Sequence, residues 1–282
     1  MSAKKKVKSE NESCFIIFRF VVKFLESMRK ILSVNLFDFL KKWLLIFGNC
    51  GFYFASGLAL LIGIIAAIRL NSFGIFATAF AYALGFFILQ FVAVKFANAG
   101  DKLISNNRTS LASSAFPDSI GLLTMIGGAL IFLYYTYLAI KTGVFAPFIQ
   151  GLSAFIFFEL VALLSLNPKS ITVEIGEDTS AGQEAIGIVT FFLKIFMKLI
   201  PVIFGLGIII GTILMFIHSF GLFKEGFGRS FAWMRVESDM VTVAGAALFP
   251  LIGYIVFVFV FLTIDVVRAI LSIPKKLDKL AK

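Results

Sequence analysis

Six long apolar runs constrain this chain more than any other feature of its sequence. A helix needs roughly 20 predominantly apolar residues to cross a hydrocarbon core of about 30 Å. The runs cover residues 43–68, 73–94, 119–140, 144–166, 199–218 and 241–264. Hydrophobic residues make up 60% of the chain and charged residues 15%, against about 45–50% and about 25% in soluble domains. The sequence therefore predicts an all-α, polytopic membrane helix bundle and excludes an ordinary soluble globule, a disordered chain and a disulfide scaffold.

The charged residues predict how this bundle is oriented. With six spans, both termini share one side, and that side holds 21 of the 26 Lys and Arg residues. Basic flanks stay in the cytoplasm. We therefore expect a cytoplasmic basic tail with amphipathic interfacial helices at residues 1–42 and a second cytoplasmic basic tail at residues 265–282. The transmembrane domain covers residues 43–264, with a cytoplasmic loop between the fourth and fifth spans at residues 167–198. Because no soluble domain remains to bind nucleic acid, the positive charge indicates topology and contact with anionic lipids.

Two stretches are predicted to lie as helices at the surface of the bilayer. In the first, basic and polar residues recur at helical spacing on one face of an apolar stretch, and a second short piece begins near Asn35. The other stretch precedes Pro201, which we expect to separate it from the fifth span. Both stretches place cations where they can contact lipid headgroups, namely Arg19, Lys23, Lys30, Lys194 and Lys198. For the first stretch, the alternative is packing beneath the protein's own spans.

Two other segments outside the spans have distinctive patterns. Residues 170–175 alternate polar and apolar side chains and form the best strand candidate. Since no partner strand lies nearby in sequence, they are either an extended linker or a strand that adds to a partner subunit. The outer loop 219–240 carries five aromatic residues, which predicts that it folds back on the membrane surface or meets a partner.

Small residues recur at four-residue spacing within several spans. Helices in lipid associate through close backbone approach, so such faces predict helix packing. We expect the first two spans to form an antiparallel hairpin through these faces, and the fifth span to pack through its own small residues. The predicted packing positions are Gly51, Ala55, Ala59, Gly63, Ala67, Ala77, Ala81, Gly85, Gly207 and Gly211.

Glu159 is the only acidic residue well inside a predicted span. Carboxylates inside membranes are rare and are candidates for function. Together with Gln90 of the second span, Glu159 forms the candidate intramembrane polar site. Transport sites usually contain several polar groups near the midplane, so a structural ion pair or hydrogen bond is the preferred interpretation and transport the alternative.

A second candidate is a pair formed by Ser153 and His218. The segment Gly151-Leu152-Ser153-Ala154 resembles the serine motif of rhomboid intramembrane proteases, which also have six helices. The resemblance implies Ser153 as nucleophile and His218 as base. Ala154 stands where that motif ends in Gly, and His218 ends the fifth span rather than lying in the last. A small-x-Ser-small segment is also a common packing motif, which is the preferred interpretation here.

The remaining chemistry is sparse. One His and two Cys cannot supply a dedicated His/Cys metal site, and the glycines of the fifth span follow no strand that would make them a nucleotide fingerprint. We therefore predict no metal, no cofactor and no catalytic residue.

Three functional hypotheses follow from these patterns. The first is a non-catalytic scaffold or accessory subunit of a larger membrane complex. Independently of the function, we expect other membrane subunits or further copies of this chain as partners. The second is an ion or small-solute channel or transporter that uses Glu159. The third and most remote is an intramembrane serine protease.

Overall fold

A computed structural model describes residues 19–107, 109–143, 145–176, 181–223 and 228–280, with side chains described as far as residue 270 except at Ala146. Residues 1–18, the start of the predicted basic tail, lie outside this range, as do the side chains of most of the predicted C-terminal tail. The chain is almost entirely helical, which confirms the predicted all-α class. An N-terminal helix (19–31) precedes α2 Val34–Leu70, α3 Phe73–Asn106, α4 Ala115–Thr142, α5 Ala146–Leu166, α6 Ala181–Ser219 and α7 Gly228–Leu280.

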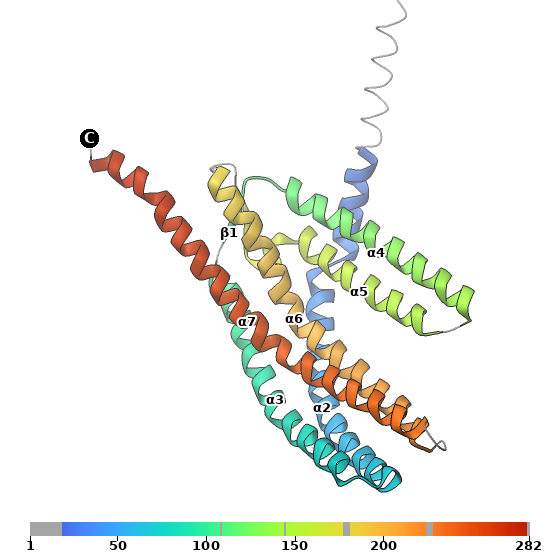
Figure 1. Cartoon of the computed structure of the whole chain (residues 1–282). Helices are drawn as coiled ribbons and strands as arrows, with labels where there is room; N and C mark the ends of the chain where they lie inside the picture. The colour runs from blue at the N-terminus through green and yellow to red at the C-terminus, as the bar shows by residue number, and fades with distance from the viewer. Residues whose placement is uncertain (1–18, 108, 144, 177–180, 224–227, 281–282) are drawn as a thin grey trace, which may run out of the picture. The chain divides into compact units, whose positions relative to one another are not determined.

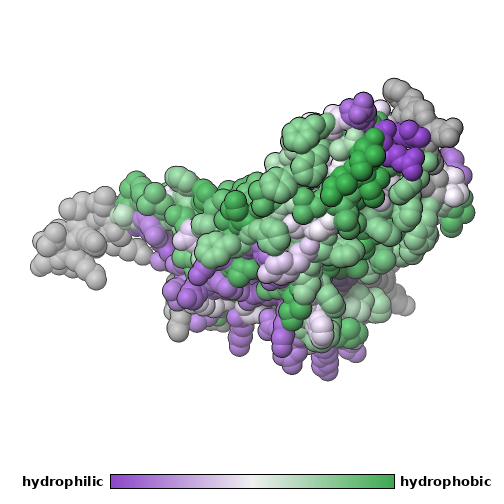
Figure 2. All heavy atoms as spheres, turned by 90° about the horizontal axis from the view of Figure 1, so that it is seen from below, coloured by the Kyte–Doolittle hydropathy of each residue, from purple (hydrophilic) through white to green (hydrophobic). Residues whose placement is uncertain are grey.

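Six of these helices, α2 to α7, are long and apolar enough to cross a membrane. Their most apolar stretches have mean hydropathies between 1.7 and 2.6. This confirms the six predicted runs and the multi-pass class. Several helices extend beyond the predicted spans, since α3 continues past Val94 to Asn106 and α7 begins at Gly228 rather than near Val241. Figure 2 shows hydrophobic residues over much of the visible surface, with hydrophilic side chains in separate patches.

Pro201 does not separate an interfacial helix from a span, contrary to the prediction. It lies within the continuous helix α6 and is buried. Proline removes one backbone donor and usually kinks or breaks a helix. Here the neighbouring residues pack closely on α7, where a Cβ at Gly253 would clash with Ile200. This packing holds the helix together on both sides of Pro201.

The chain divides into two compact units, which are described separately. Unit 1 consists of Met1–Asp38 and Ser110–Ser180, and unit 2 of Phe39–Thr109 and Ala181–Lys282. Helix α2 therefore begins in unit 1 and continues into unit 2.

In unit 1, α4 and α5 form an antiparallel hairpin (Figure 1). Glycines bring the two backbones together: a Cβ at Gly121 would lie 2.8 Å from Leu166, and one at Gly128 would lie 2.9 Å from Phe158. The N-terminal helix packs on this hairpin through Leu25, which forms an apolar cluster with Met125, Ala162 and Leu166.

One side of the N-terminal helix therefore packs against the protein's own helices α4 and α5. This packing was the alternative to a purely interfacial placement. The other side of the helix exposes apolar side chains, since Phe20 is 71% and Ile31 is 61% exposed. The second short piece expected near Asn35 is the first part of α2, so it is continuous with the first span. A single break at residues 32–33 separates the two helices.

The strand candidate pairs within the same chain. β2 Val173–Ile175 forms a two-stranded sheet with β1 Thr109–Leu111, and Gly176 donates a hydrogen bond to the Leu111 carbonyl at 2.9 Å. The residues before β2 form a 3-10 helix, η1 Pro168–Ile171, rather than strand. Both sequence interpretations of 170–175, the linker and the addition to a partner, are corrected by this pairing with a strand about 60 residues earlier.

Unit 2 contains α2, α3, α6 and α7, with α6 and α7 running side by side in opposite directions (Figure 1). Its core contains Phe52, Phe86 and Phe204, one from each of three helices and all buried. The Phe52 ring centroid lies 6.1 Å from that of Phe86 and 5.7 Å from that of Phe204. Ser56 also donates a hydrogen bond to the Ala83 carbonyl at 2.8 Å, which links α2 to α3.

The small residues of the first span lie at packed positions. Ala55 and Ala59 are fully buried, Gly63 contacts Ala79 of α3, and a Cβ at Gly51 would lie 2.9 Å from Ile208 of α6. Ala67 is only half-buried, while Ala66 is fully buried. In the fifth span, a Cβ at Gly207 would lie 2.5 Å from Ala246 and one at Gly211 would lie 2.7 Å from Val243, so these glycines face α7.

The face predicted for the second span is wrong. Ala77 and Ala81 are exposed, and a Cβ at Gly85 would meet no atom within 4 Å. The buried face instead contains Ala79, Ala83, Phe86, Ala93 and Ala97. Alternating alanines at 77, 79, 81 and 83 offer two equally small faces, and Ala79, on the buried one, contacts Gly63.

The described part of residues 219–240, the predicted outer loop, packs on its own chain. It contains a 3-10 helix, η2 Phe220–Phe223, in which Leu222 is buried, and the first turns of α7, in which Trp233 is buried. A Cβ at Gly221 would lie 2.7 Å from Ala232, which shows how closely these segments approach. Phe227 lies outside the described residues.

Candidate functional site

One end of unit 2 contains a cluster of paired polar groups from α2, α3 and α6. Asp101, near the end of α3, forms an ion pair with Lys41 of α2 and lies 3.9 Å from the ammonium nitrogen of Lys198 of α6. One carboxylate thus connects three helices. Lys198 was predicted to contact lipid headgroups, but its side chain is only 18% exposed and faces Asp101.

Lys194 was also predicted to contact lipid headgroups, but its side chain lies inside the protein. It is fully buried and donates a hydrogen bond to the Asn107 carbonyl. The reason is the length of α3, which continues 12 residues beyond its predicted end at Val94 and so brings its C-terminal end to α6. A buried ammonium group needs acceptors, and the last carbonyls of a helix lack partners within that helix.

The other predicted contacts for lipid headgroups lie on the surface. Arg19, Lys23 and Lys30 of the N-terminal helix are all exposed. Arg29 of the same helix forms an ion pair with Asp118 at the start of α4. Sequence reasoning missed both this pair and Asp101, because ion pairs between distant helices leave no periodic signal.

Glu159 and Gln90, the candidate intramembrane polar site, are both half-buried and belong to different units. Gln90 donates a long hydrogen bond of 3.5 Å to the Asn49 carbonyl of α2. Within the described ranges, Glu159 on α5 has no hydrogen bond or ion pair. The structural ion pair that was the preferred interpretation of Glu159 therefore has no counterpart among the described contacts.

His218 and Asp239 form a close pair at the opposite end of unit 2. The Nδ1 atom of His218, at the end of α6, lies 2.7 Å from Oδ2 of Asp239 on α7. Arg235 lies one turn earlier on α7 and stacks over the Phe231 ring, with 4.6 Å between its guanidinium carbon and the ring centroid. Sequence reasoning missed Asp239 because it placed residues 219–240 in a loop, whereas Asp239 lies within α7.

This pair resembles the base and orienting acid of a hydrolase. The hydroxyl of Ser153, the predicted nucleophile, donates a hydrogen bond to the Ile149 carbonyl of its own helix at 2.8 Å. Ser153 also belongs to unit 1, whereas His218 belongs to unit 2. The Ser219 hydroxyl beside His218 likewise donates to its own helix, at Phe216.

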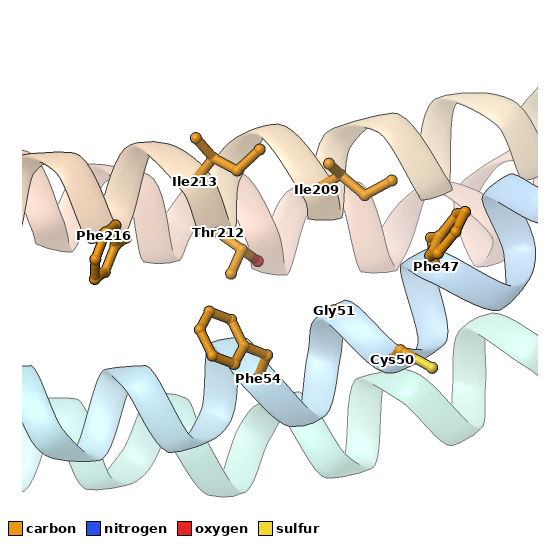
Figure 3. A pocket seen from close by; sticks show the side chains of 8 residues that line it. All are labelled: Phe47, Cys50, Gly51, Phe54, Ile209, Thr212, Ile213 and Phe216. Carbon is orange, nitrogen blue, oxygen red and sulfur yellow. The ribbon is translucent and has the colours of Figure 1, made fainter.

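A groove of about 540 Å³ lies between α2 and α6 (Figure 3). Its walls carry aromatic and aliphatic side chains, including Phe47, Phe54, Ile213 and Phe216. Among the described residues of the lining, Thr212 is the one with a hydroxyl group, which donates to the Ile208 carbonyl. Only an apolar occupant, such as a hydrocarbon chain or an apolar helix, matches these walls.

In the part of the chain that the structure describes, no group of three His, Cys, Asp or Glu residues is placed to hold a metal ion. Comparisons with family models, curated proteins and solved structures found no match for this chain.

Proposed function

We propose that this chain is a non-catalytic integral membrane protein that acts as a scaffold or accessory subunit of a larger membrane complex, with both termini in the cytoplasm. The observation that carries the proposal is the use of its polar groups. Ionisable side chains with described partners pair with a side chain of another helix, as in Arg29–Asp118, Lys41–Asp101 and His218–Asp239. Such pairs fasten helices to one another rather than gather around a substrate.

The hydroxyl groups of the spans support the same proposal. Thr136, Ser153, Thr190, Thr212 and Thr263 each donate to the carbonyl four residues earlier in their own helix. Such internal bonds give the hydroxyl donor a partner in an apolar medium, so this donor is already engaged within its own helix. The described apolar surfaces are extensive, and they suit contact with lipid or with other transmembrane helices.

The experiment is gentle solubilisation from native membranes, followed by purification and identification of the chains that accompany the protein. The proposal predicts one or more membrane proteins in constant ratio to this chain, at levels not found with an unrelated multi-pass protein from the same membranes. Loss of all accompanying chains under every gentle condition would contradict it.

A channel or transporter that uses Glu159 is the second candidate. It is favoured by one observation: in the described ranges this carboxylate lies within an apolar helix without a hydrogen-bond or ion-pair partner. Reconstitution into liposomes, with ion flux measured for the parent and for Glu159→Gln, tests it. A Glu159→Gln variant that conducts as the parent does would exclude the role of this residue.

A further inference from the structure

A second cavity lies in unit 1 at the C-terminal end of the N-terminal helix, beside Arg29. It has a volume of about 520 Å³, within the range of roughly 300–1,000 Å³ that is typical of small-molecule sites. Arg29 and Lys169 both line it, and we call it the Arg29–Lys169 pocket. It lies where the N-terminal helix, the start of α4, the end of α5 and β2 meet.

Among the described residues that line the pocket, the two ionisable side chains are the cations Arg29 and Lys169, and none is acidic. Glu174, although it lies between the lining residues Val173 and Ile175 on β2, is not part of the lining. Asp118 pairs with an Nη atom of Arg29 but does not line the pocket. The pocket therefore favours an anion.

Both cations have unused capacity to bind one. The Nε atom of Arg29 is buried and has no hydrogen-bond partner within the described residues, although buried donors are almost always paired. Lys169 is exposed and, over the same residues, takes part in no ion pair. An arginine and a lysine at one site are typical of phosphate recognition.

The rest of the lining is mixed. Ser114, Asn167 and Ser170 contribute polar groups, while Leu166, Val173 and Ile175 form an apolar wall. The Asn167 amide is occupied, because it donates to the carbonyls of Leu32 and Leu163. The ligand that fits is therefore amphipathic, with an anionic group for the cations and carbon atoms for the wall.

The surface beside the pocket suits a lipid as the source of such a group. The N-terminal helix, which supplies Arg29, exposes Phe20 and Ile31 as well as Lys23 and Lys30. Exposed aromatic and aliphatic side chains together with cations are typical of helices at the headgroup boundary. We propose that the Arg29–Lys169 pocket binds the phosphate of an anionic phospholipid headgroup, with the glycerol carbons against its apolar wall.

The test uses the full-length protein in detergent and titrates it with phosphatidylglycerol or with phosphatidylcholine of the same acyl chains. Bound lipids are counted by native mass spectrometry. We expect one saturable phosphatidylglycerol site that phosphatidylcholine does not fill. sn-Glycerol 3-phosphate serves as the competitor: no displacement at equal concentration identifies the lipid as the source, whereas full displacement identifies a soluble phosphate ester.

Two matched pairs of variants locate the site. Lys169→Gln should lower the affinity about fivefold, equivalent to the roughly 1 kcal/mol of one Lys near an anionic surface, without removing a described ion pair. Lys141→Gln, which changes an exposed lysine in the last turn of α4 and outside the lining, should leave the saturable site unchanged. Ile175→Trp, which adds bulk at the pocket wall, should abolish saturable binding, whereas Ile31→Trp should not.

Each variant is checked for its elution volume and its thermal midpoint, so that unfolding is not read as lost binding. Equal binding of both lipids, no saturable binding by the parent, or equal effects of Lys169→Gln and Lys141→Gln would each overturn the proposal.

Discussion

The ammonium group of Lys194 on α6 donates a hydrogen bond to the carbonyl oxygen of Asn107, the residue that follows α3. Lys194 is fully buried, so this contact fastens the end of α3 to the middle of a helix distant in sequence. It also separates Lys194 from the lipid headgroups that its helical spacing predicts it to contact.

Replacing Lys194 by alanine should destabilise the protein. The change removes the hydrogen bond from the buried ammonium group to the Asn107 carbonyl, and a hydrogen bond that involves a charged group contributes about 1.5–3 kcal/mol. The measurement is the thermal midpoint in detergent, with Lys95→Ala as the control, because Lys95 is exposed on α3. Equal midpoints for the two variants would show that the Lys194 contact contributes nothing.

The contact between α2 and α6 should respond to a single methyl group. A Cβ at Gly205 would clash with the Leu44 backbone carbonyl, whereas a Cβ at Gly57 would meet no atom within 4 Å. Gly205→Ala should therefore lower the thermal midpoint, since overpacking typically costs about 1–3 kcal/mol. Gly57→Ala should leave it unchanged or raise it, because alanine favours helix by roughly 0.5–1 kcal/mol. The opposite order of the two midpoints would contradict this packing.

His218 and Asp239 should behave as one unit in a double-mutant cycle. Their side chains are 26% and 9% exposed and are joined by a contact of 2.7 Å. We expect His218→Ala, Asp239→Ala and the double variant to give a coupling free energy of about 0.5–3 kcal/mol in denaturant unfolding. The matched cycle on Asp265 and Arg268, an exposed pair at 3.6 Å, should give less than about 0.5 kcal/mol. Additive effects at His218 and Asp239 would refute the pair.

The proposed orientation can be measured with single cysteines. In a background without Cys14 and Cys50, Thr142→Cys at the end of α4 should react with a membrane-impermeant maleimide in intact cells. Asn106→Cys at the end of α3 should react only after permeabilisation, because the excess of Lys and Arg places that end in the cytoplasm. Both side chains are exposed, so accessibility within the protein does not bias the comparison. The reverse labelling pattern would invert the topology.

Much of the fold could be predicted from the sequence because its strongest signal is physical and local. Twenty apolar residues span a bilayer whatever lies beside them, and the six runs correspond to helices α2 to α7. The face of α2 was also predictable, since Ala55 and Ala59 belong to one uninterrupted stripe of small residues.

The misses share another origin, which is contact between residues far apart in the chain. Alanines at 77, 79, 81 and 83 offer two alternative faces, and only packing against Gly63 decides between them. Pro201 weakens α6 locally, yet packing on α7 keeps the helix continuous. The pairing of β2 with β1 likewise depends on the tertiary arrangement. The same holds for the Lys41–Asp101 pair and for the His218–Asp239 pair.

The mass of the protein in a disc of native membrane excised without detergent tests the proposed function most directly. One chain has a mass of 31.1 kDa. We expect the protein content of each disc to exceed this mass and to include at least one different chain at a fixed ratio. Discs that hold a single copy of this chain, or only copies of it, would contradict a scaffold or accessory subunit of a larger complex.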